Sequence, residues 1–291
     1  MLAQVLLTPT ESKRIISKAV ARLDIVKEAQ AAGTIVLHPC SDTYFLIEEL
    51  TGKKPWTDVW VCGVVVPKAL CNEIGPRLAS YENPETRTGK PNPNEFPHTW
   101  VIKQGQLSIG EPLSKILEGL GPQDVYIKGV NAIDCEGNVG TLIGNPVGGG
   151  TISKVMKASR KRGFKIIYPV GLEKLVPFPV KEVAKEARKK YYEYGMGIAC
   201  GLLPCQGMVV NELRAIELLS GATAVPIAAG GLGGAEGAIV LVIKGDREKV
   251  EAAIKCVEES KGAKLPQLRT ANCHDCRHSH CKFPVKDKPW L

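Results

Sequence analysis

The sequence predicts an α/β fold in which helices cover a sheet of mainly parallel strands. Its first two thirds alternate between short runs of β-branched and apolar residues, typical of buried strands, and longer runs with apolar residues at helical spacing. Several predicted strands end in glycine-rich or polar turns that lead directly into the next helix. These observations predict a Rossmann-like parallel sheet domain in residues 1–195.

The predicted elements of this domain follow one another in a regular order. The first helix covers residues 8–33, capped by Thr8 or Thr10 and ended by Gly33. The segment from residue 72 to residue 100 is polar and rich in proline and glycine, which predicts a long surface loop. Single strands are predicted in "TIVLHP", "DVWVCGVVVP", "DVYIKGVNAID" and "FKIIYPV", and a pair of strands in "TWVIKQGQLS". Helices are predicted in "TYFLIEEL", "EPLSKILEGL" and "VKEVAKEARKKYYEYG".

The last third of the chain has a different pattern. Residues 205–262 contain a helix, two strands and a second helix, which predicts a smaller α+β domain of ferredoxin-like type. Modules of this type commonly oligomerise, so we expect a homo-oligomer. Residues 263–291 are irregular and rich in cysteine and histidine, and we treat them as a separate tail.

Composition narrows the classes of ligand. The net charge is +8, which favours an anionic partner, but the basic residues are dispersed and aromatic residues make up only 5% of the chain. This distribution argues against a nucleic-acid partner. No apolar run approaches the length of a membrane helix, and no secretory signal is recognisable, so we expect a cytoplasmic protein whose cysteines are reduced or metal-bound.

A glycine-rich loop, "GNPVGGGT", lies between a predicted strand and a predicted helix. Glycines let an anion approach the backbone N–H groups, and the helix N-terminus adds a partial positive charge. We therefore predict an anion site at Gly148, Gly149, Gly150 and Thr151. The alternative is a tight turn that only allows close packing between strand and helix.

The segment from residue 124 to residue 176 resembles the superfamily of ribose-5-phosphate isomerase A, glucosamine-6-phosphate deaminase and the coenzyme A transferases. The matching stretches are "KGVNAID", "GGGT" and "EKLV", and the earlier "LHPCSDTYFLIEEL" is similar to the first strand–turn–helix of that superfamily. The resemblance covers about residues 10–180. It implies the α/β fold and a pocket for an anionic small molecule.

The resemblance also implies roles for particular residues. It leaves Asp134 and Glu173 as candidate acids or bases. His38 is a third catalytic candidate, because it lies at the carboxyl end of a predicted parallel strand, where it would face the cleft. The additional candidates for ligand binding are Ser41, Asp42, Asn131 and Lys174. The chain departs from the pattern of the sugar-phosphate isomerases, because Asn131 stands where an acid is expected and Pro146 and Val147 stand where a lysine is expected. Asparagine has no titratable carboxylate and cannot serve as a general base.

Each candidate catalytic residue has a simpler interpretation. Asp134 lies in "DCEGN", which is typical of a turn, and Glu173 and Lys174 could form a solvated ion pair. His38 follows a predicted buried strand and is equally consistent with a packed, hydrogen-bonded residue. A nucleophile–base pair formed by Cys40 and His38 is a further interpretation.

The stretch "CHDCRHSHC" predicts a metal site in the tail. Cys273 and Cys276 have the spacing of a zinc knuckle, and the other candidate ligands are Cys281, His278 and His280. A cysteine from elsewhere, Cys200 or Cys205, could complete a tetrahedral site. We predict a structural zinc ion, with an iron–sulfur cluster or no bound metal as the alternatives.

These features predict a protein that binds a phosphorylated or carboxylated metabolite, acting as an isomerase or a transferase if it is an enzyme. The alternative is a non-catalytic regulatory protein, or one that responds to metal or redox state through its cysteines. The absence of an acid at Asn131 favours the non-catalytic alternative.

Overall fold

We describe the fold from a computed structural model of the chain. The described residues are 1–54, 61, 65–71, 99–109, 111–144, 149–187, 192–276, 281 and 283. Most of the predicted strand in "DVWVCGVVVP" and nearly all of the predicted loop from residue 72 to residue 100 lie outside them, as do Gly148, His278 and His280.

The centre of the molecule is a six-stranded mixed sheet, which confirms the predicted α/β fold. Its order is β12-β10-β7-β2-β5-β6. Four neighbouring strands are parallel, namely β12 (Met208–Val210), β10 (Lys165–Pro169), β7 (Val125–Ile127) and β2 (Thr34–Leu37). The other two, β5 (Trp100–Lys103) and β6 (Gln106–Ile109), form an antiparallel hairpin beside β2.

The hairpin makes this sheet mixed where the sequence predicts a mainly parallel one. Gln104 and Gly105 both have positive φ, at 48° and 72°, at the turn between β5 and β6. Two successive left-handed residues match the twist of a tight antiparallel hairpin. The local turn chemistry therefore sets the direction of these two strands.

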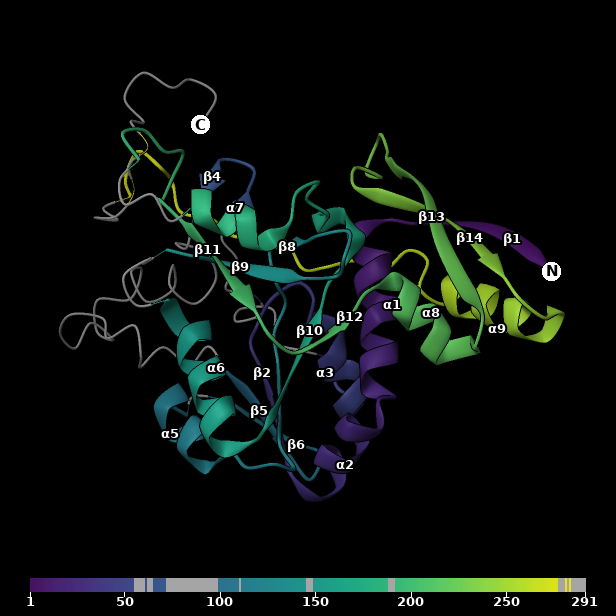
Figure 1. Cartoon of the computed structure of the whole chain (residues 1–291), viewed down its shortest axis with the longest axis horizontal. Coiled ribbons are helices and arrows are strands. Elements are labelled where there is room, and N and C mark those ends of the chain that lie inside the picture. The colour runs from purple at the N-terminus through teal and green to yellow at the C-terminus, as the bar shows by residue number, and fades with distance from the viewer. Residues whose placement is uncertain are drawn as a thin grey trace.

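Helices cover both faces of the sheet (Figure 1). One side carries α1 (Pro9–Ala21), α2 (Asp24–Ala32) and α3 (Tyr44–Thr51), and the other carries α5 (Leu113–Gly119) and α6 (Gly150–Arg162). Strand β2 is buried on both faces, because Ile35 and Leu37 join one apolar core and Val36 joins the other. This double burial explains why "TIVL" is continuously apolar.

The segment predicted as one helix forms two. Thr8 caps α1, with a reciprocal hydrogen bond between its backbone N–H and the Glu11 carboxylate. Leu23 then adopts an extended conformation, and α2 runs from Asp24 to Ala32 with Gly33 as its C-cap, where the sequence predicts the end. The break lets each helix lay its own apolar side on the core.

A second, antiparallel sheet has the order β1-β14-β13. Strands β13 (Thr223–Gly230) and β14 (Ala238–Lys244) lie between α8 (Glu212–Ser220) and α9 (Arg247–Glu258), in the predicted helix–strand–strand–helix order. The N-terminal strand β1 (Leu2–Leu7) pairs with β14 along its whole length.

The pairing of β1 with β14 was not predicted, and it brings N-terminal residues into the sheet formed by residues 205–262. The apolar core is continuous between the two parts, since it contains side chains of α1, β2 and β14. The division at residues 195, 205 and 262 and the homo-oligomer stay predictions.

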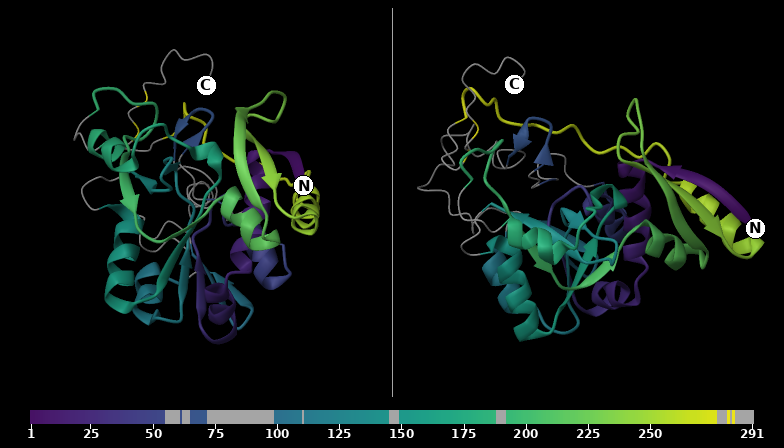
Figure 2. Two further views of the ribbon diagram at one scale, coloured as in Figure 1. Left: turned by 45° about the vertical axis from the view of Figure 1, so that its right-hand side comes forward. Right: turned by 45° about the horizontal axis from the view of Figure 1, so that its top comes forward.

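Several small elements lie over one end of the central sheet (Figure 2). A three-stranded antiparallel sheet is formed by β8 (Ala132–Ile133), β9 (Val139–Ile143) and β11 (Gly201–Cys205). The remaining elements are the short helix η2 (Leu172–Lys174), helix α7 (Val180–Glu186) and the hairpin of β3 (Val65–Val66) and β4 (Ala69–Leu70). Among the described helices, none has both the length and the apolar character needed to cross a bilayer.

Candidate functional site

A cavity of about 730 Å³ lies where β2, β7 and β10 end. His38 follows β2 directly, Lys128 follows β7, and η2 begins shortly after β10. The chain passes from β2 to strands on one side and later returns to β7 on the other side, so the strand order reverses between these two strands. Open α/β sheets usually bind their ligands at this point of reversal.

The turn between β2 and α3 holds polar side chains at the wall of the cavity. The Thr43 hydroxyl donates a hydrogen bond to the carbonyl of His38 at 2.7 Å and accepts one from the backbone N–H of Cys40 at 3.1 Å. Thr43 is fully buried, which fixes the turn. Cys40, Ser41 and Asp42 consequently line the cavity.

Gly129 is required by the close approach of β7 to this turn. A Cβ atom at this position would lie 2.1 Å from Oδ2 of Asp42 and 2.9 Å from Sγ of Cys40. Both contacts are shorter than packing allows. The glycine of "KGVNAID" therefore makes space for the Asp42 carboxylate beside the strand end.

Two lysine–carboxylate pairs form one end of the cavity. Nζ of Lys174 lies 2.5 Å from Oδ2 of Asp42, and Nζ of Lys13 lies 2.5 Å from Oε1 of Glu173. Burial acts to lower the pKa of Lys174, but the charges of Asp42 and Glu173 outweigh it and raise that pKa above its usual value. Lys174 therefore stays cationic.

Each of these carboxylates has one oxygen without a partner in the described part of the chain. Oδ1 of Asp42 and Oε2 of Glu173 are buried and make no hydrogen bond there. Buried carboxylate oxygens ordinarily find donors. Asp42 and Glu173 both line the cavity.

A third acid, Glu212, lies behind Glu173. It is fully buried and accepts the backbone N–H of Leu172 with both carboxylate oxygens, each at 3.0 Å. Burial, together with the charge of Glu173, raises the pKa of Glu212 to about 7. Glu212 therefore holds the first residue of η2, and its own carboxyl group changes its protonation state near neutral pH.

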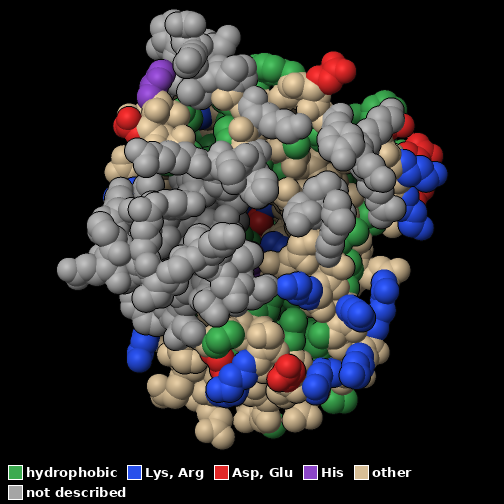
Figure 3. Space-filling model, turned by 90° about the vertical axis from the view of Figure 1, so that its left-hand side faces the viewer, with side chains coloured by type: hydrophobic (Ala, Val, Ile, Leu, Met, Phe, Trp, Pro, Cys, Tyr) green, Lys and Arg blue, Asp and Glu red, His purple; other side chains and the backbone are tan. Residues whose placement is uncertain are grey.

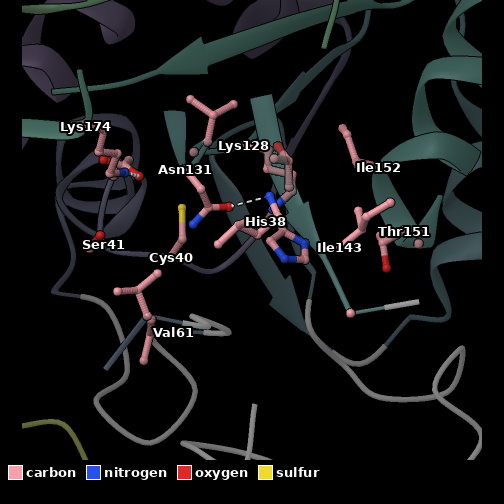
Figure 4. Close-up of a pocket in the computed structure, with 18 of the residues that line it drawn as sticks. His38, Cys40, Ser41, Val61, Lys128, Asn131, Ile143, Thr151, Ile152 and Lys174 are labelled. Atoms are coloured by element: carbon pink, nitrogen blue, oxygen red, sulfur yellow. Dashed lines mark hydrogen bonds and ion pairs between the residues drawn. The ribbon is translucent and has the colours of Figure 1, made fainter. Parts of the chain in front are cut away.

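The start of α6 forms the opposite end of the cavity. Gly149 and Gly150 have φ values of 67° and 60°, and Gly150 and Thr151 line the cavity. The N-terminus of a helix of this length favours an anion. Figure 4 shows Lys174 and Ser41 on one side of the cavity and Thr151 on the other, with His38, Lys128 and Asn131 between them.

His38 and Asn131 occupy the middle of the cavity wall. Oδ1 of Asn131 accepts the backbone N–H of Leu142 at 2.9 Å, which ties the segment directly before β8 to β9. Nδ1 of His38 lies 3.4 Å from the hydroxyl of the buried Tyr126. His38 is therefore packed and hydrogen-bonded as well as facing the cavity.

The structure brings together most of the residues that the sequence singled out. His38, Ser41, Asp42, Asn131, Gly150, Thr151, Glu173 and Lys174 all line one cavity. Gly149 lies at the start of α6, next to the lining residue Gly150. Seen from the side of α5 and α6, an acidic and a basic side chain are visible in a hollow near the middle of the molecule (Figure 3).

Asp134 is the exception among the described candidates. It does not line the cavity, and its carboxylate accepts hydrogen bonds from the backbone N–H groups of Glu136, Asn138 and Val180 at 2.9–3.0 Å. Burial acts to raise the pKa of Asp134, but these hydrogen bonds outweigh it and lower that pKa. These contacts agree with the alternative interpretation, in which Asp134 stabilises a turn.

Sequence reasoning missed two cationic residues, Lys128 and Lys13. Lys128 comes directly after "VYI", and the rule that ligands bind at the carboxyl ends of parallel strands would have identified it. Lys13 carries no such signal. It belongs to the first helix, and only packing of α1 against η2 brings it to Glu173.

The predicted metal ligands divide into two groups. Cys273, Cys276 and Cys281 line a second, smaller cavity, whereas His278 and His280 are outside the described residues. Within the described part of the chain, no group of three Cys, His, Asp or Glu side chains is arranged to hold a metal ion. The zinc ion and the iron–sulfur cluster thus stay predictions.

Cys200 and Cys205, the two candidate metal ligands from outside the tail, lie away from the tail cysteines. Sγ of Cys205 contacts the carbonyl of Leu203 and the hydroxyl of Thr141. Cys200 is buried, and burial raises the pKa of its thiol to about 11, which disfavours the thiolate that a metal requires. Neither residue lines the smaller cavity with the tail cysteines.

Comparison with known proteins does not assign a function to the candidate site. No protein-family model matches the chain. No curated protein matches it either. A solved structure described as D-ribose-5-phosphate isomerase in complex with phospho-erythronic acid aligns with 82% of this chain and 81% of its own, at 15% identity and a TM-score of 0.29. A likeness at this level establishes neither a shared activity nor a shared ligand.

Proposed function

We propose that the large cavity binds a small anionic metabolite with a phosphate or carboxylate group and several hydroxyl groups. The observation that carries the proposal is the composition of the cavity wall. It combines cationic and helix-N-terminal groups with two buried carboxylates that each have a hydrogen-bonding oxygen to spare.

The anionic group has two favourable partners. Lys128 lines the cavity, and no carboxylate lies within ion-pair distance of it among the described residues. The start of α6 adds its partial positive charge at Gly150 and Thr151. Lys174 contributes less, because its charge is already balanced by Asp42.

The hydroxyl groups have partners at the other end. Oδ1 of Asp42 and Oε2 of Glu173 can only accept hydrogen bonds while they are ionised. A sugar derivative carries several hydroxyl donors, and its size suits a cavity of about 730 Å³. A ligand with an anion at one end and hydroxyl groups along its length satisfies both ends.

A proton-transfer reaction is a second proposal for the same site. In an isomerisation of a hydroxycarbonyl compound, a carboxylate removes a proton from the hydroxyl-bearing carbon next to the carbonyl and returns it to the former carbonyl carbon. The hydroxyl proton passes to the former carbonyl oxygen, and a cation stabilises the oxygen that is negative in between. Asp42 and Glu173 are the candidate bases, and Lys174 is the candidate cation. This reaction would use the same two carboxylates that the binding proposal assigns to the hydroxyl groups.

Binding can be tested by calorimetry with inorganic phosphate, a sugar phosphate, a sugar carboxylate and an uncharged sugar. We expect the sugar phosphate or sugar carboxylate to bind more tightly than either inorganic phosphate or the uncharged sugar. Lys128→Gln should weaken binding of the anionic compounds at least tenfold, which corresponds to about 1.4 kcal/mol. Lys103→Gln is the matched control, because Lys103 is exposed and pairs with Thr34 at the opposite end of β2.

Two results would contradict the binding proposal. One is equal binding of the charged and uncharged sugars. The other is equal loss of affinity in the Lys128 and Lys103 variants, which would indicate a general charge effect.

Catalysis can be tested separately with a ligand that binds. Incorporation of deuterium from heavy water at the carbon next to the carbonyl would reveal proton transfer even without net turnover. Glu173→Gln and Asp42→Asn should abolish or greatly slow this exchange. Tight binding with no exchange in the unmodified protein would sink the enzymatic proposal and leave the binding proposal standing.

A further inference from the structure

We propose that Cys71, Cys273, Cys276 and Cys281 together bind one zinc ion, and that Cys71 is the ligand from outside the tail. These four residues, here called the thiol cluster, line a single cavity of about 120 Å³. Cys71 directly follows β4, about 200 positions before the other three cysteines. The fold therefore brings a fourth thiol to the three cysteines of the tail.

Backbone contacts fix the place where these segments meet. The backbone N–H of Ile198 donates to the carbonyl of Leu70 at 2.8 Å, and Ile198 also forms an antiparallel bridge with Cys281. Gly197 permits this approach, because a Cβ atom there would lie 1.9 Å from the carbonyl oxygen of Leu70. The segment of Gly197 and Ile198 therefore contacts the end of β4 on one side and the tail on the other.

The chemistry of four thiols indicates the ion. Four thiolates around one ion form the closed tetrahedral arrangement of structural zinc sites, and the two-residue gap between Cys273 and Cys276 is typical of such a knuckle. None of the four residues is fully buried, so an ion can reach them. The ligands come from segments with little apolar core, which a structural ion would hold together.

The four thiols are not yet in coordinating positions, because no three metal-ligating side chains in the described part of the chain surround a common point. They do face the same small cavity. Rotation about χ1 between staggered rotamers can turn a cysteine sulfur into such a cavity without moving the backbone. Binding of zinc would supply the free energy for this rearrangement.

The cluster also adjoins the larger cavity. Val66 lines both cavities, and the tail residue Leu268 lines the larger one. A zinc ion held by Cys71 and the tail cysteines would fix the β3–β4 hairpin, which forms part of the wall of the proposed ligand site. The zinc site itself does not depend on the proposed ligand.

Metal analysis of the whole protein tests the inference directly. The protein is purified without oxygen and chelator, and zinc and iron are measured together with the absorbance spectrum. We expect about one zinc per chain, no visible colour, and loss of most of the zinc in Cys71→Ser to the same degree as in Cys276→Ser. Cys135→Ser is the matched control, since Cys135 is exposed in the β8–β9 turn and should not affect the metal.

A second variant separates loss of a ligand from loss of folding. Cys71→His keeps a zinc ligand at the same position and should retain more zinc than Cys71→Ser, with circular dichroism checking that both are folded. Full zinc content in Cys71→Ser would overturn the role of Cys71 and point to a tail histidine. Iron with a brown absorption band, or no metal in the unmodified protein, would overturn the zinc assignment.

Discussion

At the scale of single residues, the most informative feature is a group of charged side chains that are buried together. Lys174 and Asp42 form one pair and Lys13 and Glu173 form another, and all four side chains are at most 18% exposed. Removing one partner of such a pair leaves the other charge desolvated and uncompensated. The free energy of folding should therefore respond strongly to these residues.

We expect Lys174→Met to lower the free energy of unfolding by about 3 kcal/mol, because Asp42 then remains buried without its cation. Adding Asp42→Asn should restore most of this loss. Urea denaturation at neutral pH measures both values. Lys27→Met is the control, since the Lys27–Asp24 pair is exposed and should contribute less than about 1 kcal/mol.

If the double variant is no more stable than Lys174→Met, the two side chains do not form a coupled pair.

Glu212 gives a prediction for the pH dependence of stability. Its pKa is raised to about 7 in the folded protein, so the folded state holds a proton that the unfolded state has already released between about pH 4.5 and 7. The contribution of Glu212 to the free energy of unfolding is fully present below pH 4.5 and is lost as the pH rises through 7. Glu212→Gln should remove this loss and stabilise the protein at pH 8 by up to about 3 kcal/mol.

Thermal or urea unfolding between pH 4 and 8 measures the effect of Glu212→Gln. Glu182→Gln, at an exposed site of α7, should leave the pH profile unchanged. An equal gain in stability from Glu212→Gln at pH 4 and pH 8 would show that ionisation is not its cause.

At the scale of elements, strand β1 and helix α1 connect the antiparallel sheet to the candidate site. Strand β1 pairs with β14, and Thr8 then caps α1, whose residue Lys13 reaches the candidate site. The side chains of β1 alternate between solvent and core, so that Leu2 is 72% exposed and Leu7 is fully buried. The N-terminal strand is therefore part of the packed structure.

This alternation predicts unequal effects of the same substitution along β1. Leu7→Ala should lower the free energy of unfolding by about 3 kcal/mol, because it leaves a cavity in the core. Leu2→Ala should change it by less than about 0.5 kcal/mol. Urea denaturation of the two variants is the measurement, and equal effects would contradict the observed register of β1 on β14.

At the scale of the whole molecule, two cavities share a wall. Val66 contributes to both, and the segment that includes Leu268 passes the larger cavity before it reaches Cys273. If the two proposals hold, occupation of the thiol cluster should order the wall of the ligand site. Binding of metal and binding of ligand would then be coupled.

We expect removal of zinc with a chelator to weaken binding of the anionic ligand several-fold, and Cys71→Ser to have the same effect. Calorimetric titration of the ligand with and without added zinc measures this coupling. Zinc should restore affinity in the unmodified protein but not in Cys71→Ser. Unchanged affinity in the metal-free protein would show that the two sites are independent, without affecting either site taken alone.

The sequence by itself determined the type and order of most elements. Runs such as "TIVL" and "FKIIYP" are apolar over their whole length, and a strand buried on both faces needs that pattern. It also determined much of the candidate site, because His38, Asp42 and Asn131 lie in turns after strands, where parallel strands bring their ends together, and Lys174 lies in the short helix η2 after β10.

Only the tertiary structure decided which distant residues meet. Strand β1 pairs with β14, Lys13 pairs with Glu173, and Cys71 joins the tail cysteines, yet each partner is more than 150 positions away in the chain. Local propensities act over a few residues and carry no information about such pairings. The structure also adds a distant contact to Asp134, because its carboxylate accepts the backbone N–H of Val180 besides those of its own turn.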